Sequence, residues 1–114
     1  MPSPTRDTLL HIAERTHWET ARAAGVSYTM STLGRTLDDE GFIHCSSEMD
    51  QVDGVLARFY GAVPREDLVL LVVDVSRLDA PVRHEPVGDD VFPHVFGPIP
   101  VSAVIEVRSL PQNR

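Results

Sequence analysis

The run Leu68 to Val73 places the strongest constraint on how this chain can fold. Its six residues are all apolar, and the first polar residue after them is Asp74. Side chains of a strand alternate between its two faces, so an unbroken apolar run requires cover on both faces. The run is far shorter than the ~20 residues that a membrane-spanning helix needs. It therefore predicts a central β-strand inside a domain that packs on both sides of a sheet.

The rest of the chain alternates strand and helix signals around this run. Strands are predicted at residues 8–13, 41–45, 82–87 and 104–109. Helices are predicted from a Thr16–Glu19 capping box to Gly25, from Ser31 to near Leu37, and from Ser47–Asp50 to Gly61. The proline-rich segment 88–100 is typical of an ordered, non-repetitive loop. We expect one α+β domain over residues 7–109, with about five strands in a mixed or antiparallel sheet, two or three helices in the N-terminal half, and tails at 1–6 and 110–114.

The net charge and the cysteine content restrict the expected binding partners and the expected cellular compartment. The net charge is −7, from 10 basic and 17 acidic residues, and the basic residues form no block, which argues against a nucleic-acid partner. Cys45 is the sole cysteine, as expected in a reducing compartment. The N-terminus lacks the pattern of a signal peptide. We expect a cytoplasmic protein with no membrane association.

The segment Glu40–Ser46, EGFIHCS, places a histidine beside a thiol on a short strand. Alternation puts Phe42, His44 and Ser46 on one face and Ile43 and Cys45 on the other. His44 therefore cannot be the base that activates Cys45. A buried free cysteine is the common case, and Cys45 is predicted to be structural.

Several segments resemble one protein family. They are EGFIHCS (40–46), Gln51, Phe59–Tyr60, LVLLVVDVSRL (68–78) and FPHVFGPIP (92–100). The chain resembles a bacterial family catalogued as domain of unknown function nine hundred and fifty-two, whose members are often labelled glutathione S-transferase-like. That family is similar in fold to the ADP-ribosyltransferase group, including its RNA 2'-phosphotransferase branch. The resemblance implies an ADP-ribosyltransferase-like fold with a nucleotide-binding cleft, and NAD as the cofactor of a transfer reaction.

Three residues are the candidates for catalysis. His11 lies inside an apolar strand, where the alternative is a core histidine bonded to backbone. His44 ends its strand before a serine-rich helix start, where exposed amides favour anions. Glu85 shares a strand face with Arg83 and Val87; the resemblance implies that a late-strand acidic residue orients the ribose, although the usual neighbours of that motif are absent. The predicted catalytic residues are His11, His44 and Glu85.

Four further residues are candidates for ligand binding. His94 lies in the proline-rich segment between two phenylalanines, Ser46 and Ser47 follow the strand of His44, and Tyr28 can stack on a flat ring. Loop packing for His94, helix capping for the serines and packing against the sheet for Tyr28 are the structural alternatives. No HxH, HExxH or paired-cysteine spacing occurs, so no metal site is predicted.

These residues lead to one functional hypothesis and one rival. The hypothesis is that the protein binds a nucleotide or another phosphorylated small molecule in a cleft lined by His11, His44 and His94, and acts as an NAD-dependent transferase. The rival is a non-catalytic ligand-sensing or protein-interaction module.

Overall fold

Strand β3 (Leu68–Asp74) lies at the centre of the first sheet, as the apolar run predicts. A computed structural model describes residues 7–110, and in it β3 pairs antiparallel with both β1 (Thr8–Glu14) and β6 (Val104–Ser109). All seven residues of β3 are buried. The prediction of a strand covered on both faces is confirmed.

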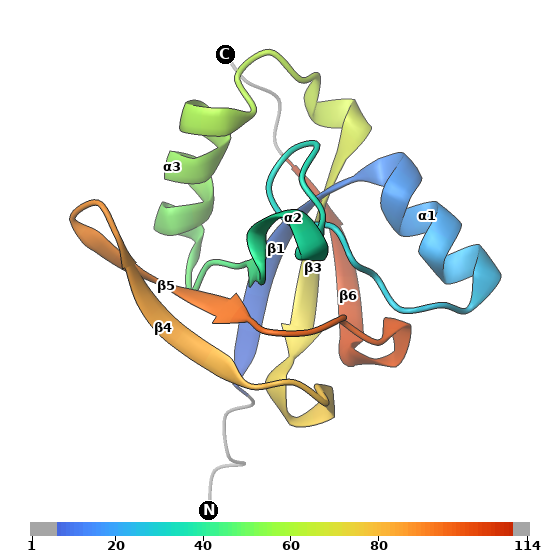
Figure 1. Cartoon of the computed structure of the whole chain (residues 1–114). Helices are drawn as coiled ribbons and strands as arrows, with labels where there is room; N and C mark the ends of the chain where they lie inside the picture. The colour runs from blue at the N-terminus through green and yellow to red at the C-terminus, as the bar shows by residue number, and fades with distance from the viewer. Residues whose placement is uncertain (1–6, 111–114) are drawn as a thin grey trace, which may run out of the picture.

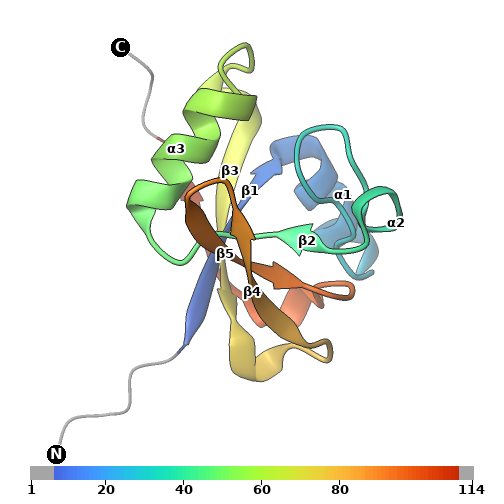
Figure 2. The same cartoon turned by 60° about the vertical axis from the view of Figure 1, so that its left-hand side comes forward.

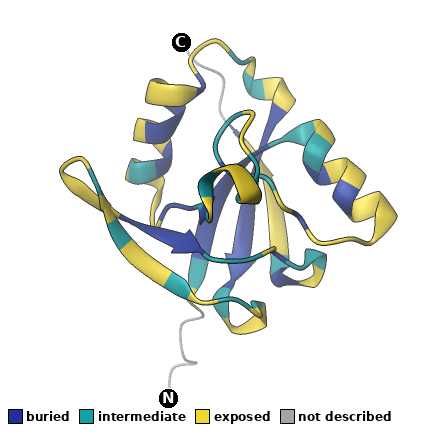
Figure 3. Cartoon of the chain, viewed as in Figure 1, coloured by how far each residue is buried: buried dark blue, intermediate teal, exposed yellow. Residues whose placement is uncertain are grey.

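The two faces of this sheet carry separate apolar clusters. Val69, Leu71 and Val73 face one cluster, and Leu68, Leu70 and Val72 face the other. Helix α1 (Arg15–Ala24) contributes Trp18 and Ala21 to the first cluster, and α3 (Met49–Phe59) contributes Val52, Val55 and Leu56 to the second. Figure 1 shows α3 on one side of the sheet and α1 on the other, and Figure 3 shows the dark blue of the buried strands between them.

A second antiparallel sheet lies in front of the first and has the strand order β2–β5–β4. Its strands are β2 (Ile43–His44), β5 (Asp90–Val95) and β4 (Val82–Val87). The chain passes from β2 to the edge of β1, where the backbones of Leu10 and Ser46 exchange hydrogen bonds of 2.8 and 2.7 Å. Figure 2 shows this sheet crossing in front of β1 and β3. The junction brings residues of β1 close to residues of β2 and β5.

The described residues therefore form a small α+β domain, as predicted, with three α-helices that all lie before residue 60. The strands form two three-stranded antiparallel sheets and not one sheet of about five strands. Short 3-10 turns precede or follow strands at Arg65–Asp67, Val75–Arg77 and Val101–Ala103. Of the predicted tails 1–6 and 110–114, residues 1–6 and 111–114 lie outside the described residues. Leu110 is buried in the second cluster, so its assignment to the C-terminal tail is wrong. Within residues 7–110 no helix has both the length and the apolar character needed to span a membrane.

Two predicted helix starts are wrong. Helix α1 begins at Arg15 after Glu14, without a side-chain cap, although it ends at Gly25 as predicted. Helix α2 is Leu37–Glu40 and is capped by Thr36, not Ser31. Asp38, Asp39 and Glu40 form the first turn of this helix, where negative charge is favourable.

The predicted loop at 88–100 contains strand β5, so this prediction is wrong as well. Pro93 lies within the strand. Its carbonyl accepts the amide of Cys45 at 3.0 Å. In an antiparallel ladder the N and C=O of a residue point to the same neighbour, so the position that lacks an N–H faces the two-residue strand β2 and not β4. The hairpin with β4 therefore keeps its pairing despite the proline.

Candidate functional site

Three histidines that are far apart in the sequence meet where the two sheets join. His11 lies on β1, His44 at the end of β2 and His94 on β5, where it pairs with His44. Nδ1 of His11 lies 2.7 Å from the carbonyl oxygen of His44. Nδ1 of His44 lies 3.0 Å from Nε2 of His94. The three residues thus form one hydrogen-bonded group.

The backbone of His44 is fixed by two side chains. The hydroxyl oxygen of Ser31 accepts the amide of His44 at 3.1 Å, and the ring of His11 donates to its carbonyl. Ser31 and His11 are both buried. This arrangement holds the imidazole of His44 in one position relative to the sheets.

His11 is fully satisfied by protein partners. Its Nδ1–H donates to the His44 carbonyl, so Nε2 is the acceptor and takes a hydrogen bond of 3.0 Å from the Tyr28 hydroxyl. Burial lowers the pKa of His11 from 6.5 to about 4, with a smaller opposing contribution from the bond to His44. His11 is therefore neutral near pH 7, and both ring nitrogens are in use.

Glu85, His94 and His44 form a second chain of hydrogen bonds. A carboxylate only accepts, so Nδ1–H of His94 donates to Oε1 of Glu85 at 2.7 Å. In the tautomer in which His94 has a single ring proton, on Nδ1, its Nε2 is an acceptor and Nδ1–H of His44 donates to it. Phe42 stacks on the His94 ring, with centroids 3.9 Å apart and planes 8° apart. The chain then ends at Nε2 of His44, which carries a lone pair.

Nε2 of His44 is buried and has no hydrogen-bond partner among the described residues. Burial, and secondly the repulsion between an imidazolium on His44 and one on His94, lower the pKa of His44 to about 4. The residue lines a recess of only about 10 Å³, room for about one water molecule. The recess is formed by Leu10, His11, Ile12, Ser31, Thr32, His44, Ser46, Val55 and Tyr60.

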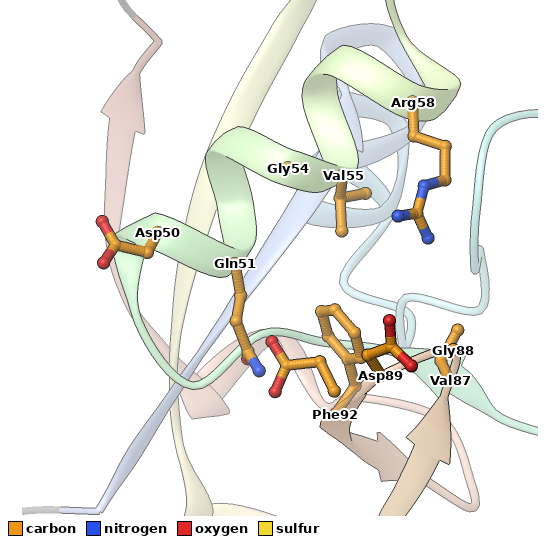
Figure 4. A pocket seen from close by; sticks show the side chains of 10 residues that line it. Asp50, Gln51, Gly54, Val55, Arg58, Val87, Gly88, Asp89 and Phe92 are labelled. Atoms are coloured by element: carbon orange, nitrogen blue, oxygen red, sulfur yellow. The ribbon is translucent and has the colours of Figure 1, made fainter.

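A larger cavity lies next to this recess, between α3 and the tip of the β4–β5 hairpin. Its volume is about 390 Å³, within the range of small-molecule sites. Figure 4 shows its walls: helix α3 above, the hairpin below and the ring of Phe92 between them. The Phe92 ring also packs against His44, with centroids 4.8 Å apart. Phe92 therefore separates the cavity from the His44 ring.

The comparisons with known proteins place the chain in a family. The model of the family described as Protein of unknown function (DUF952) matches residues 12–107. The chain belongs to this family.

Solved structures of one bacterial protein have the same fold. The crystal structure of protein CC0527 from Caulobacter crescentus is 27% identical, with a TM-score of 0.73, and the match covers 93% of this chain and 88% of that one. Its solution NMR structure is 26% identical, with a TM-score of 0.67 and coverage of 94% and 87%. No protein with a curated description matches the chain. None of these comparisons names an ADP-ribosyltransferase or a glutathione S-transferase, and both likenesses stay predictions.

The predicted site residues of this family member divide into two groups. His11, His44, Glu85 and His94 belong to one connected group, Tyr28 supports it through His11, and Ser46 lines the recess. Ser47 lies elsewhere: it is exposed and lines a different depression, with His84 and Val82. Within residues 7–110 no group of three or more His, Cys, Asp or Glu side chains is placed to hold a metal ion.

The backbone after Cys45 differs from the expected anion site. The amides of Cys45, Ser46 and Ser47 donate to the carbonyls of Pro93 and Leu10 and to the side chain of Gln51, respectively. None of the three is free to bind a phosphate. Cys45 itself is buried as predicted, and burial raises the pKa of its thiol to about 12.

Sequence reasoning missed Ser31, Phe42 and the cavity beside α3. Ser31 was assigned to a helix start, because a serine before apolar residues at helical spacing is a common cap. Phe42 had a usable signal, since it shares a strand face with His44. The cavity depends on how α3 and the hairpin approach each other, which no local pattern reports.

Proposed function

We propose that this protein binds a small molecule at His44 and moves a proton to or from it, with His44 as the general base. The observation that carries the proposal is the buried Nε2 of His44, which ends the chain from Glu85 without a protein partner among residues 7–110. Buried polar atoms normally find a partner, so an open one at the end of a hydrogen-bond chain favours an external partner. The fixed backbone of His44 adds the preorganisation that a catalytic group needs.

The hydrogen-bond chain from Glu85 through His94 to His44 explains how a histidine with a low pKa can serve as a base. An imidazolium on His44 alone is disfavoured, as its pKa of about 4 indicates. When Nε2 of His44 takes a proton, its Nδ1–H can pass to Nε2 of His94, and the positive charge moves next to the Glu85 carboxylate. An opposite charge in contact stabilises an imidazolium. In this scheme His44 touches the substrate, while His94 and Glu85 position and stabilise it.

A nucleotide is the ligand class that the family resemblance suggests, with NAD-dependent transfer as the reaction. The ribose hydroxyls of a nucleotide suit the lone pair of His44, because a hydroxyl donates a hydrogen bond and can lose a proton. The phosphates have less support, since the amides after Cys45 are occupied and His11 and His44 are neutral. We therefore assign a single ribose hydroxyl group, and not a phosphate, to the His44 recess, which has room for about one water molecule.

The alternative is a non-catalytic ligand-sensing or interaction module, and the size of the recess favours it. A volume of about 10 Å³ admits a water molecule but not a sugar ring. In this case Nε2 of His44 would bind a fixed water, and the chain from Glu85 would be structural.

Titration of NAD, AMP and ribose 5-phosphate against four proteins tests the proposal. They are the wild type, His44→Ala, Glu85→Gln and His84→Ala, the last as a control because His84 is exposed and lies on the opposite face of β4 from Glu85. We expect His44→Ala to weaken binding roughly tenfold or more, and Glu85→Gln to slow turnover of bound NAD with a smaller effect on affinity. Phosphorus NMR reports NAD consumption. Binding without turnover would establish the module, and equal affinities of His44→Ala and wild type would exclude His44 as the contact.

A further inference from the structure

The cavity between α3 and the hairpin has features of a second ligand site, and it does not depend on the role of His44. Its helical wall consists of Asp50, Gln51, Gly54, Val55 and Arg58. The last four positions follow the i, i+3, i+4, i+7 spacing that places side chains on one helix face. The opposite wall is the hairpin tip with Asp89 and Asp90.

Two residues of α3, Gln51 and Gly54, shape the cavity. Gln51 ties the two walls together: its Nε2 donates to the Val91 carbonyl at 2.8 Å, while its Oε1 accepts the amide of Ser47 at 2.8 Å. Gly54 lies in the middle of α3, where glycine costs about 0.5–1 kcal/mol relative to alanine. A Cβ added at Gly54 would meet nothing within 4 Å. Neither close packing nor backbone conformation requires a glycine at this position.

Charges of opposite sign line the cavity and are not paired with each other. Figure 4 shows the Arg58 guanidinium and the Asp89 carboxylate facing the same space from the helix and from the hairpin. No ion pair or side-chain hydrogen bond involves either group within the described part of the chain. Asp90 adds a second carboxylate on the hairpin and Asp50 a third on the helix, and Val55, Val87 and Phe92 provide an apolar floor.

We propose that this cavity binds a small zwitterion, an α-amino acid with an apolar side chain. The ammonium group would bind Asp89, the carboxylate would bind the planar guanidinium of Arg58, and the side chain would pack on Val55 and Phe92. A ligand with no net charge is not repelled by the protein's charge of −7. Phe92 lies between this ligand and His44, so the two sites are separate spaces that share one wall.

Calorimetric titration with L-phenylalanine tests the proposal, with two analogues as chemical controls. N-acetyl-L-phenylalanine lacks the positive charge and L-phenylalaninamide lacks the carboxylate. We expect saturable binding of L-phenylalanine at millimolar concentrations and binding weakened roughly tenfold or more for each analogue, since each loses a charge-assisted contact. Absence of binding by L-phenylalanine, or equal binding of all three, would overturn the assignment.

Variants at Gly54 and at the two charges locate the ligand. Gly54→Met should fill the cavity and abolish binding, while Gly54→Ala, the matched control, should keep it. Asp89→Asn should weaken the binding of L-phenylalanine about tenfold. Arg58→Gln should weaken the binding of L-phenylalanine more than that of L-phenylalaninamide, which has no carboxylate. His84→Ala should bind L-phenylalanine as the wild type does, because His84 is exposed and does not line the cavity. If Gly54→Met folds and binds normally, the ligand lies elsewhere and the proposal is wrong.

Discussion

The histidines of the two sheets differ in how completely their ring nitrogens are hydrogen-bonded. On the first sheet His11 is buried and both of its ring nitrogens have protein partners, within a strand of otherwise apolar neighbours. On the second sheet His44 and His94 continue a chain from Glu85 that stops at an open nitrogen. Burial and a lowered pKa are common to His11 and His44. The incomplete set of partners, and not burial, distinguishes the functional candidate.

The largest effect should appear at Cys45, which lies next to His44 but faces the first sheet. Its thiol pKa is raised by burial from 9.0 to about 12. Since the thiolate is the reactive form, native labelling by iodoacetamide should be about a thousandfold slower than labelling in urea. The double variant Cys45→Ser/Ser47→Cys supplies an exposed thiol two residues away as the control. Fast native labelling of Cys45 would show that the two faces of β2 are equally accessible.

The second prediction compares the two linked histidines by stability. His11→Ala leaves the Tyr28 hydroxyl and the His44 carbonyl without a partner and should lower the free energy of unfolding by about 2–4 kcal/mol. His44→Ala removes a ring with an open nitrogen and should cost about 1–2 kcal/mol. Urea unfolding followed by circular dichroism measures both. A larger loss for His44→Ala would mean that the second sheet depends on this residue for stability.

The sequence was sufficient for the features that depend on local alternation. It predicted the burial of β3 on both faces, the opposite orientations of His44 and Cys45, and the placement of Glu85 with Arg83 and Val87. These follow from the two-residue period of a strand.

The features set by tertiary contacts were not predictable in this way. Strand β5 was interpreted as a loop because the sequence does not reveal that Pro93 faces a two-residue partner strand. Ser31 was assigned to a cap because its true contact, the amide of His44, is formed by residues 13 positions apart. The order of contacts from Glu85 to His44 depends on the register of three strands, which only the assembled sheet defines.

A third prediction concerns pH. The pKa values of His11 and His44 are lowered from 6.5 to about 4 in the folded protein, so between these values the unfolded chain binds more protons. Stability should therefore be highest above pH 6.5 and should fall as the pH decreases towards 4. Each histidine contributes at most about 1.4 kcal/mol per pH unit, and His44 less because it is partly exposed.

The control for this pH dependence is His11→Gln, which removes one titrating group. Its unfolding free energy should vary less steeply between pH 4 and 6.5 than that of the wild type or of His84→Ala, whose substituted histidine is exposed. Equal slopes in all three proteins would mean that His11 accepts a proton in the fold as readily as in the unfolded chain.

The smallest effect, and the only increase in stability, is expected at Gly54 on the helix that faces the second sheet. Gly54→Ala adds a methyl group that contacts nothing within 4 Å and reduces the backbone entropy of the unfolded chain. The free energy of unfolding should rise by about 0.5–1 kcal/mol. The matched change at the end of α1, Gly25→Ala, should be destabilising, because Gly25 has a φ of 68° that favours glycine. Thermal unfolding of both variants measures the difference. A loss of stability in Gly54→Ala would show that the glycine is needed for packing, and the space beside α3 would then have a structural origin.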